Sequence, residues 1–201
     1  DRDNIAGRMG PNNIVMGWKG KDSILYRSRW RAITPFKGDL KVVSAEGGMP
    51  RTLPLSSGGF ADFSPDQEQL AFNRVFREFR TWKHYRGGMA DDVRIMDRSN
   101  GEIRAITNSK AQDIIPMWHG DKVYFLSDRN WRMNLFSYDT ETQEIQQETE
   151  FDTYDIKFPS IGPGAIVFAK GGYLYTFDVS TGETQKVKVN ISNDQVGPGH
   201  K

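Results

Sequence analysis

The stretch "FSPDQEQLAF", residues 63–72, joins a turn signal to a short apolar run. Pro65 fixes its own φ near the value that a type I turn requires, and the Asp66 side chain can bond back to the backbone. The run "QLAF" that follows has the length of a buried strand rather than of a helix. A second strand, ending at Asp97, precedes the glycine turn "SNGE" (99–102). The stretch therefore predicts short antiparallel strands joined by tight turns.

The same two elements recur along the chain about every 45 residues, a spacing typical of β-propeller blades. The first is an apolar run that contains an aromatic residue, and it occurs as "SILYRS" (23–28), "QLAFNR" (69–74), "KVYFLS" (122–127) and "AIVFAK" (165–170). The second is a strand with the turn that follows it, and it occurs as "DLKVVSAEGG" (39–48), "DVRIMDRSNGE" (92–102), "NLFSYDTETQE" (134–144) and "YLYTFDVSTGE" (173–183).

Each period divides into four short strands, and no segment shows a sustained, capped helical stripe of apolar residues. The sequence therefore predicts an all-β protein, a β-propeller of four-stranded antiparallel blades. About four blades fit within one propeller domain or segment (1–201), over residues 12–55, 60–107, 113–149 and 154–189. Four blades can close by themselves, or they belong to a six-bladed ring and leave two open apolar faces.

The composition excludes several classes of function. The chain holds 27 Lys and Arg against 26 Asp and Glu, so it lacks the basic excess of a nucleic-acid-binding protein. It has no cysteine, which excludes disulfides, thiolate metal ligands and cysteine nucleophiles. No apolar run reaches membrane-spanning length. We therefore expect neither nucleic acid nor a membrane as a partner, and no motif predicts a cofactor.

Residues with catalytic or metal-binding chemistry are sparse. The three histidines do not form a His-Glu-x-x-His motif, and there is no Gly-x-Ser-x-Gly elbow. "WHGD" (118–121) fits a hairpin turn better than a metal site, because a metal needs three or four ligands. In "DRNW" (128–131) we expect Asp128 and Arg129 to form a turn ion pair or a backbone cap. No catalytic residue and no metal ligand is predicted.

The longest irregular segment lies between Phe72 and Asp97, where we predict an insertion between the second and third strands of the second blade. A smaller insertion, "RSRWRAITPFKGD" (27–39), is expected at the same place in the first blade. Because successive blades are neighbours, both insertions should emerge on one face and form a joint basic-aromatic rim. The candidate binding residues of this rim are Arg77, Arg80, Trp82, Lys83, Tyr85, Arg86, Arg29, Trp30 and Arg31.

Two interpretations of the rim remain open. Arginine and tryptophan anchor many protein–peptide contacts, and the cations can pair with acidic side chains or with a peptide carboxylate. Alternatively, the aromatic side chains pack on the neighbouring blade, and the cations pair locally with Glu78, Asp91 and Asp92. Asp91 and Asp92 themselves make a poor acid/base couple, because consecutive strand residues point to opposite faces.

The turn "SPDQ" with its following strand resembles the PD40, WD40-like repeat of TolB-type and tricorn propellers, with Gln67 in place of the usual glycine. Longer stretches resemble tricorn-type serine proteases, namely "NIVMGWKGKDSILYRSR", "GGFADFSPD", "NRVFREFRTWKHYRGGMADDV", "QDIIPMWHGDKVYFLSDR" and "GPGAIVFAKGGYLYTFD". The resemblance implies a multi-domain peptidase whose propellers filter or channel peptides and whose catalytic residues lie in a separate domain. It also implies a six-bladed propeller, and the missing initiator methionine favours a segment of such a protein.

We therefore expect a non-catalytic propeller region of a tricorn-like peptidase, acting in peptide access or in docking of domains and proteins. Its partners would be peptides or other domains of the parent protein, and oligomers through open blade edges are an alternative. The resemblance implies a prokaryotic source and leaves the compartment open between cytoplasm and periplasm. Two other functions stay open: a TolB-like stand-alone binding propeller, and a propeller hydrolase.

Overall fold

The computed structural model describes residues 12–30, 32, 36–76, 85, 87 and 89–190. These residues form four sheets of four strands each, and they contain no helix. The strands are β1 Ile14–Lys19, β2 Ser23–Ser28, β3 Asp39–Ser44, β4 Arg51–Thr52, β5 Ala61–Phe63, β6 Gln69–Phe72, β7 Arg94–Asp97, β8 Ile103–Ala105, β9 Asp113–His119, β10 Lys122–Ser127, β11 Asn134–Asp139, β12 Ile145–Gln147, β13 Lys157–Ile161, β14 Ala165–Lys170, β15 Tyr173–Asp178 and β16 Thr184–Lys186.

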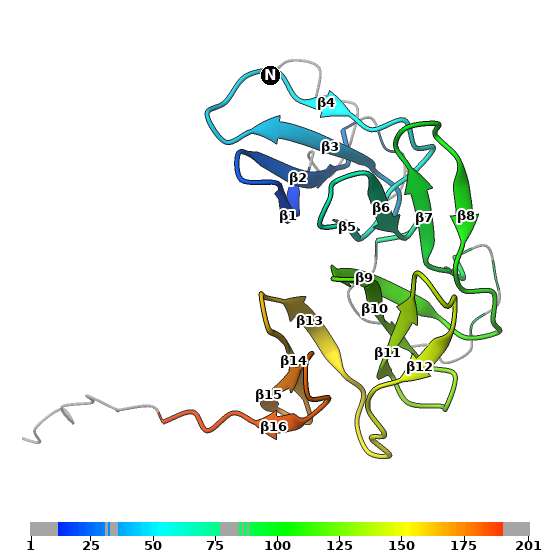
Figure 1. Cartoon of the computed structure of the whole chain (residues 1–201), viewed down its shortest axis with the longest axis vertical. Helices are drawn as coiled ribbons and strands as arrows, with labels where there is room; N and C mark the ends of the chain where they lie inside the picture. Colours follow the sequence, from blue (N-terminus) through cyan, green and yellow to red (C-terminus); the bar gives the residue numbers. More distant parts are fainter. Residues whose placement is uncertain are drawn as a thin grey trace, which may run out of the picture.

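Each sheet is an antiparallel meander of four consecutive strands. The four sheets follow one another along an arc, with β1 and β13 belonging to the sheets at its two ends (Figure 1). The first strands of neighbouring sheets contact each other: β1 touches β5, β5 touches β9, and β9 touches β13. This is the architecture of propeller blades, and the predicted all-β propeller is confirmed. Among the described residues, no helix is long and apolar enough to span a bilayer.

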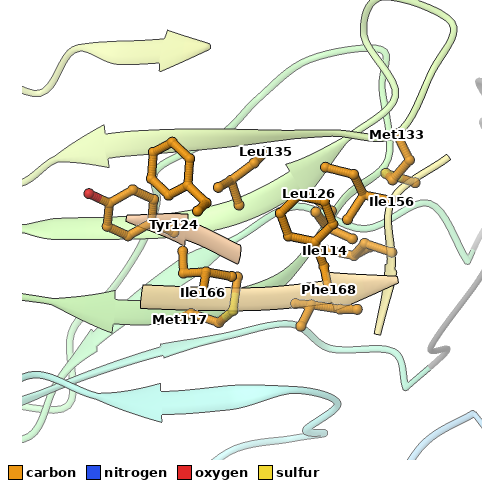
Figure 2. Close-up of a cluster of buried hydrophobic side chains, with 11 residues drawn as sticks. Ile114, Met117, Tyr124, Leu126, Met133, Leu135, Ile156, Ile166 and Phe168 are labelled. Carbon is orange, nitrogen blue, oxygen red and sulfur yellow. The ribbon is translucent and has the colours of Figure 1, made fainter. Parts of the chain in front are cut away.

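Apolar side chains fill the space between successive sheets. Figure 2 shows the cluster between the third and fourth sheets, where Leu126 and Leu135 meet Ile166 and Phe168. Alternation along each strand directs these residues to one face, and their burial supplies the main attraction between sheets. Phe72, Phe125 and Phe168 occupy equivalent places in the three clusters between sheets, which explains why the aromatic recurs in the sequence.

The first blade departs from this pattern. Its equivalent aromatic, Tyr26, is only half-buried, whereas Phe72, Phe125 and Phe168 are buried. Each buried aromatic packs against the sheet that precedes it along the chain, and Tyr26 belongs to the first sheet. Apolar residues are also exposed on the end sheets, at Val15 and Trp18 of β1, Val167 of β14 and Leu174 of β15.

The turn of the opening stretch forms as predicted. The Gln67 N–H donates to Ser64 O at 2.9 Å, and Asp66 Oδ1 accepts from the Ser64 hydroxyl at 2.6 Å and from the Glu68 N–H at 2.9 Å. Gln67 has a φ of 68°, in the left-handed region where PD40 repeats usually place glycine. Gly101 takes the same conformation in its hairpin turn, with a φ of 75°.

Replacing Gln67 by glycine should raise the free energy of unfolding by about 0.5–1 kcal/mol. Glycine removes the strain of the left-handed backbone in the folded protein, and this gain exceeds the stability lost because glycine gives the unfolded chain more conformational entropy. The matched substitution is Gly101→Ala. A Cβ at this position would meet no atom within 4 Å, so the variant should be about 1 kcal/mol less stable because of backbone strain alone. Urea unfolding of both variants measures the difference, and a destabilised Q67G protein would show that the Gln67 side chain matters more than its φ.

Candidate functional site

One face of the propeller is built from the segments that connect the second to the third strand of each blade and one blade to the next. We call it the connection face; its described residues are 29–30, 32, 36–38, 53–60, 73–76, 85, 87, 89–93, 106–112, 128–133, 148–156 and 171–172. Backbone hydrogen bonds join these segments across blades. Gly58 N donates to Gly38 O at 2.7 Å, and Ile156 N donates to Met133 O at 2.9 Å. The opposite face consists of the hairpin turns 20–22, 45–50, 64–68, 98–102, 120–121, 140–144, 162–164 and 179–183, and we call it the hairpin face.

The two predicted insertions lie where the sequence places them, between β2 and β3 and between β6 and β7. They are adjacent, because the Phe76 N–H donates to Phe36 O at 2.9 Å. Of the candidate rim residues, Arg77, Arg80, Trp82, Lys83, Arg86 and Arg31 lie outside the described residues. Arg29, Trp30 and Tyr85 are described, and the Tyr85 carbonyl accepts from Gln112 Nε2 at 2.6 Å. The binding role of the rim residues stays a prediction.

Arg27 organises the start of both insertions; the sequence places it at the start of the smaller insertion but not among the candidate binding residues. Its side chain is fully buried; Nε donates to Gly58 O at 3.2 Å, and Nη2 donates to Lys37 O at 2.8 Å. The guanidinium also stacks on the Phe76 ring at 4.6 Å. Burial, and then the charge of Arg29, lower the pKa of Arg27 to about 10, so it stays charged at neutral pH. One buried cation therefore links three connecting segments of the first two blades.

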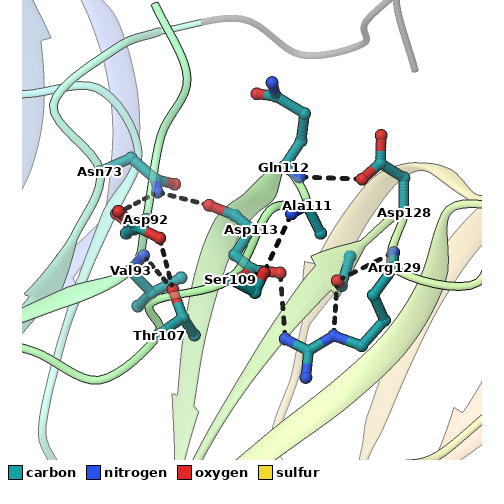
Figure 3. A network of polar contacts seen from close by, with 11 residues as sticks. Asn73, Asp92, Val93, Thr107, Ser109, Ala111, Gln112, Asp113, Asp128 and Arg129 are labelled. Atoms are coloured by element: carbon teal, nitrogen blue, oxygen red, sulfur yellow. Dashed lines mark hydrogen bonds and ion pairs between the residues drawn. The ribbon is translucent and has the colours of Figure 1, made fainter. Parts of the chain in front are cut away.

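A polar network joins the second and third blades at the same face (Figure 3). Asn73 Nδ2 donates to Asp92 O and Asp113 O at 3.1 and 3.0 Å, and Asn73 Oδ1 accepts from Ile115 N at 2.8 Å. Asp91 is buried and accepts the Val75 N–H at 2.7 Å. Burial, and next the charge of Asp113, raise the pKa of Asp92. Asn73 and Asp91 therefore hold the two ends of the second insertion together.

Asp128 and Arg129 take different roles in the structure. Asp128 is a backbone cap, accepting the Gln112 N–H at 2.8 Å. Arg129 does not pair with its neighbour; its Nη2 lies 3.2 Å from Asp113 Oδ1, and its guanidinium covers the Phe136 ring at 4.5 Å. The expected backbone cap is therefore confirmed, and Arg129 pairs with Asp113 because this buried carboxylate and the aromatic ring offer it a better-shielded site than the turn does.

Two exposed aromatic residues extend the rim to the third and fourth blades. Trp131 is 65% exposed and Tyr154 is 69% exposed, and both have positive φ, at 67° and 56°. An exposed large ring in a left-handed conformation gains little from burial and carries backbone strain, which makes Trp131 and Tyr154 candidate binding residues. Their segments are joined, since Arg132 Nε donates to Asp152 O at 3.1 Å. The Trp-Arg pair at 131–132 matches Trp30-Arg31 and Trp82-Lys83, which is the signal that could have found it.

Charge is distributed unevenly between the two faces. The described residues of the connection face hold six Lys and Arg against seven Asp and Glu, whereas the hairpin-face turns hold two against nine. The near-zero net charge of the whole chain therefore hides a polarity along the propeller axis. Acidic groups are favoured at the connection face relative to the hairpin face.

The first strands of all four sheets line a central cavity of about 460 Å³. Its walls are mostly apolar and come from segments 14–18, 60–62, 115–117 and 158–161, together with Phe76. Val15, Trp18 and Phe158 expose much of their side chains beside this cavity. A cavity of this size, with apolar walls and few polar groups, has the properties of a binding site for small ligands or short peptide segments.

Asp62 of β5 is the one ionisable residue that lines the central cavity among the described residues. Its Oδ2 accepts the Trp118 N–H from β9 at 2.8 Å, and its Oδ1 accepts the Phe63 N–H at 3.0 Å. Burial raises the pKa of Asp62 to about 6, against the opposing effect of these two hydrogen bonds. The sequence did not reveal this residue, because a single aspartate in a strand carries no motif.

Three of the four cavity-lining strands are irregular beside the cavity. The register shifts at Met16 of β1, at Ile115-Pro116 of β9 and at Phe158-Pro159 of β13. Ile115 and Phe158 have φ of 57° and 51°, which is unusual for a β-branched or bulky residue. Bulges that re-aim side chains are frequent next to functional sites. Within the described residues, no group of three or more His, Cys, Asp or Glu forms a metal site.

Comparison with known proteins shows the family to which this propeller belongs. Residues 8–183 match the family described as "Tricorn protease N-terminal beta propeller domain". This chain belongs to the tricorn N-terminal propeller family. A tricorn protease homolog of Saccharolobus solfataricus is 24% identical over 184 residues, covering 92% of this chain and 17% of the relative. Tricorn protease homolog 1 of Streptomyces coelicolor is 26% identical over 184 residues, with 90% and 17% covered.

Solved structures agree with the family assignment. The crystal structure of the tricorn protease aligns with a TM-score of 0.75 at 22% identity, over 90% of this chain and 17% of that chain. TolB from Acinetobacter baumannii aligns with a TM-score of 0.63 at 16% identity, over 88% and 43%. At these identities the structural likeness shows the propeller fold alone. The tricorn propeller chain described here spans 17% of the length of the two tricorn relatives.

Proposed function

We propose that this chain is a non-catalytic propeller region of a tricorn-like peptidase that binds and guides peptides through its central cavity. The observation that carries the proposal is the cavity itself, because the first strands of all four sheets contribute to it. Its apolar walls suit extended segments with apolar side chains.

The basic-aromatic rim complements this role. We infer that Arg77, Arg80, Trp82 and their neighbours, with Trp30 and Trp131, meet peptides or another domain at the connection face. The arginines and lysines of the two insertions favour acidic side chains or a peptide carboxylate there. This part of the proposal is supported by the adjacency of the two insertions through Phe76 and Phe36.

The cavity is tested with a neutral apolar peptide, acetyl-Leu-norleucine-Leu-amide, titrated into the full chain by calorimetry. Phe158→Glu places a charge at the apolar wall and should weaken binding at least tenfold. Met49→Glu, which changes a 95% exposed residue on the hairpin face, should leave binding unchanged. Absence of binding to the unmodified chain would overturn the proposal.

In the same assay, replacing Arg77, Arg80 and Trp82 by alanine should weaken binding of acetyl-Leu-Glu-Leu-amide without lowering Tm.

The propeller hydrolase remains the rival function. A fluorogenic peptide incubated with the full chain should show no turnover, because the catalytic residues of the family lie outside the matched region. Turnover that disappears when a serine of this chain is replaced would contradict the non-catalytic part of the proposal. A stand-alone TolB-like role would be supported instead by tight binding of a folded protein in the absence of any peptide binding.

A further inference from the structure

The central cavity contains one carboxylate without a charged partner. Among the described residues, no Lys or Arg nitrogen pairs with Asp62, whereas Asp91 and Asp113 lie 4.0 and 3.2 Å from arginine nitrogens. Burial of an ionised carboxylate without a cation costs several kcal/mol unless the group is compensated. Two backbone N–H groups compensate Asp62 only in part, since each carboxylate oxygen retains acceptor capacity. This arrangement is costly for stability and well suited to a ligand that brings a cation.

The space in front of the carboxylate is open on the β1 side. A Cβ added at Gly17 would lie 3.8 Å from Asp62 Oδ1 and meet no closer atom. Gly17 therefore leaves room for a side chain or ligand group to approach the carboxylate from the cavity. The surrounding walls at Val15, Met117 and Phe158 are apolar, so a cation that enters meets less water than at the open surface and pairs more strongly with the carboxylate.

We propose that the central cavity selects polypeptide segments that present a lysine or arginine side chain to Asp62 between apolar neighbours. The cationic nitrogen would bond the free acceptor positions of the carboxylate, while the flanking side chains pack against Val15, Met117 and Phe158. The inference rests on the proposed function, because it names the class of peptide that the same cavity prefers. Charge complementarity supports it: this carboxylate is unpaired, and it is the one charged group of the described cavity wall.

Selection should depend on pH, because a cation pairs only with the ionised carboxylate. Other titratable or charged groups lie near the strands around Asp62. His119 follows Trp118, and its Nε2 lies 2.9 Å from Pro163 O on the hairpin face. Lys19 and Arg98 lie over the Phe63 ring, at 5.8 and 5.5 Å from its centre. None of these three residues lines the cavity, so the pH dependence of lysine selection should follow Asp62.

The experiment compares three peptides that differ at one position: acetyl-Leu-Lys-Leu-amide, acetyl-Leu-norleucine-Leu-amide and acetyl-Leu-Glu-Leu-amide. Calorimetric titration of the full chain at pH 8 should give at least tenfold tighter binding of the lysine peptide than of the norleucine peptide. The glutamate peptide should bind most weakly at the cavity. At pH 5 the preference for lysine should fall several-fold.

Asp62→Asn should abolish the preference for lysine at both pH values while retaining binding of the norleucine peptide. Gly17→Leu provides a second test that does not depend on the folding of D62N. It fills the approach to the carboxylate and should weaken binding of the lysine peptide. The control Asp66→Asn changes an aspartate on the hairpin face and should keep the preference. Equal binding of the lysine and norleucine peptides to the unmodified chain overturns this inference and leaves the proposed function intact. Failure of every peptide to bind overturns both.

Discussion

Replacing Gly59 by alanine should lower the free energy of unfolding by about 3 kcal/mol, as expected for overpacking against an immobile group. A Cβ at Gly59 would lie 2.4 Å from Val75 O and 2.5 Å from Val75 C. These are backbone atoms, and they cannot rotate away as a flexible side chain can. The Gly59 N–H donates to Asn73 O at 2.7 Å, which holds the two segments at this short separation. Relief of the clash requires the start of the second insertion to move away from the blade.

The matched control is Gly164→Ala. Gly164 does not have a positive φ, and a Cβ there meets no atom within 4 Å, so the substitution should change stability by less than about 0.5 kcal/mol. Urea denaturation followed by tryptophan fluorescence measures both variants. A G59A protein as stable as G164A would mean that the contact between Gly59 and Val75 is not maintained in solution.

Replacing Asp62 by asparagine should remove a pH dependence of the free energy of unfolding of about 2 kcal/mol between about pH 4 and 6. In the unfolded chain an aspartate titrates near pH 3.9, whereas burial raises the pKa of Asp62 to about 6 in the folded protein. Between these values the folded state binds more protons. The contribution of Asp62 to stability is therefore fully present below pH 4 and is lost as the pH rises through 6.

The measurement is thermal or urea unfolding of both proteins at half-unit steps from pH 4 to pH 8. The difference between D62N and the parent chain should grow with pH and reach a plateau above pH 6. Asp66→Asn is the matched control, because hydrogen bonds from Ser64 and Glu68 lower the pKa of Asp66. That contribution has the opposite sign and is lost as the pH falls. A pH-independent difference for D62N would show that the carboxylate is better solvated than its environment indicates.

The sequence predicts the fold well because the propeller repeats the same physical pattern in each blade. The aromatics Phe72, Phe125 and Phe168 recur because each fills the space between two sheets, and Gly101 and Gly182 recur because each hairpin needs a positive φ. The position of the two insertions also follows from spacing alone. Tyr26 departs in burial because it belongs to the first sheet, where no preceding sheet is described.

The candidate site is predicted less completely. Local sequence identifies the basic-aromatic insertions, but Arg27 and Asp62 acquire their roles only when distant strands meet. Arg27 contacts residues 10 and 31 positions away, and Asp62 bonds Trp118, 56 positions away. Arg129 also pairs with Asp113 rather than with its sequence neighbour Asp128 because distant segments meet. Pairings that span two blades depend on three-dimensional packing and leave no fixed spacing in the chain.

The difference in charge between the two faces gives the electric potential along the central cavity a direction. The excess of acidic residues at the hairpin face, against a nearly balanced charge among the described residues of the connection face, produces an electric field along the axis of the propeller. A free peptide has a positive amino end and a negative carboxyl end, so in this field its two orientations differ in energy. If the cavity binds peptides as proposed, the carboxyl end would be drawn toward the connection face and the amino end toward the hairpin face. The propeller would thus sort peptides by polarity before any side chain is recognised.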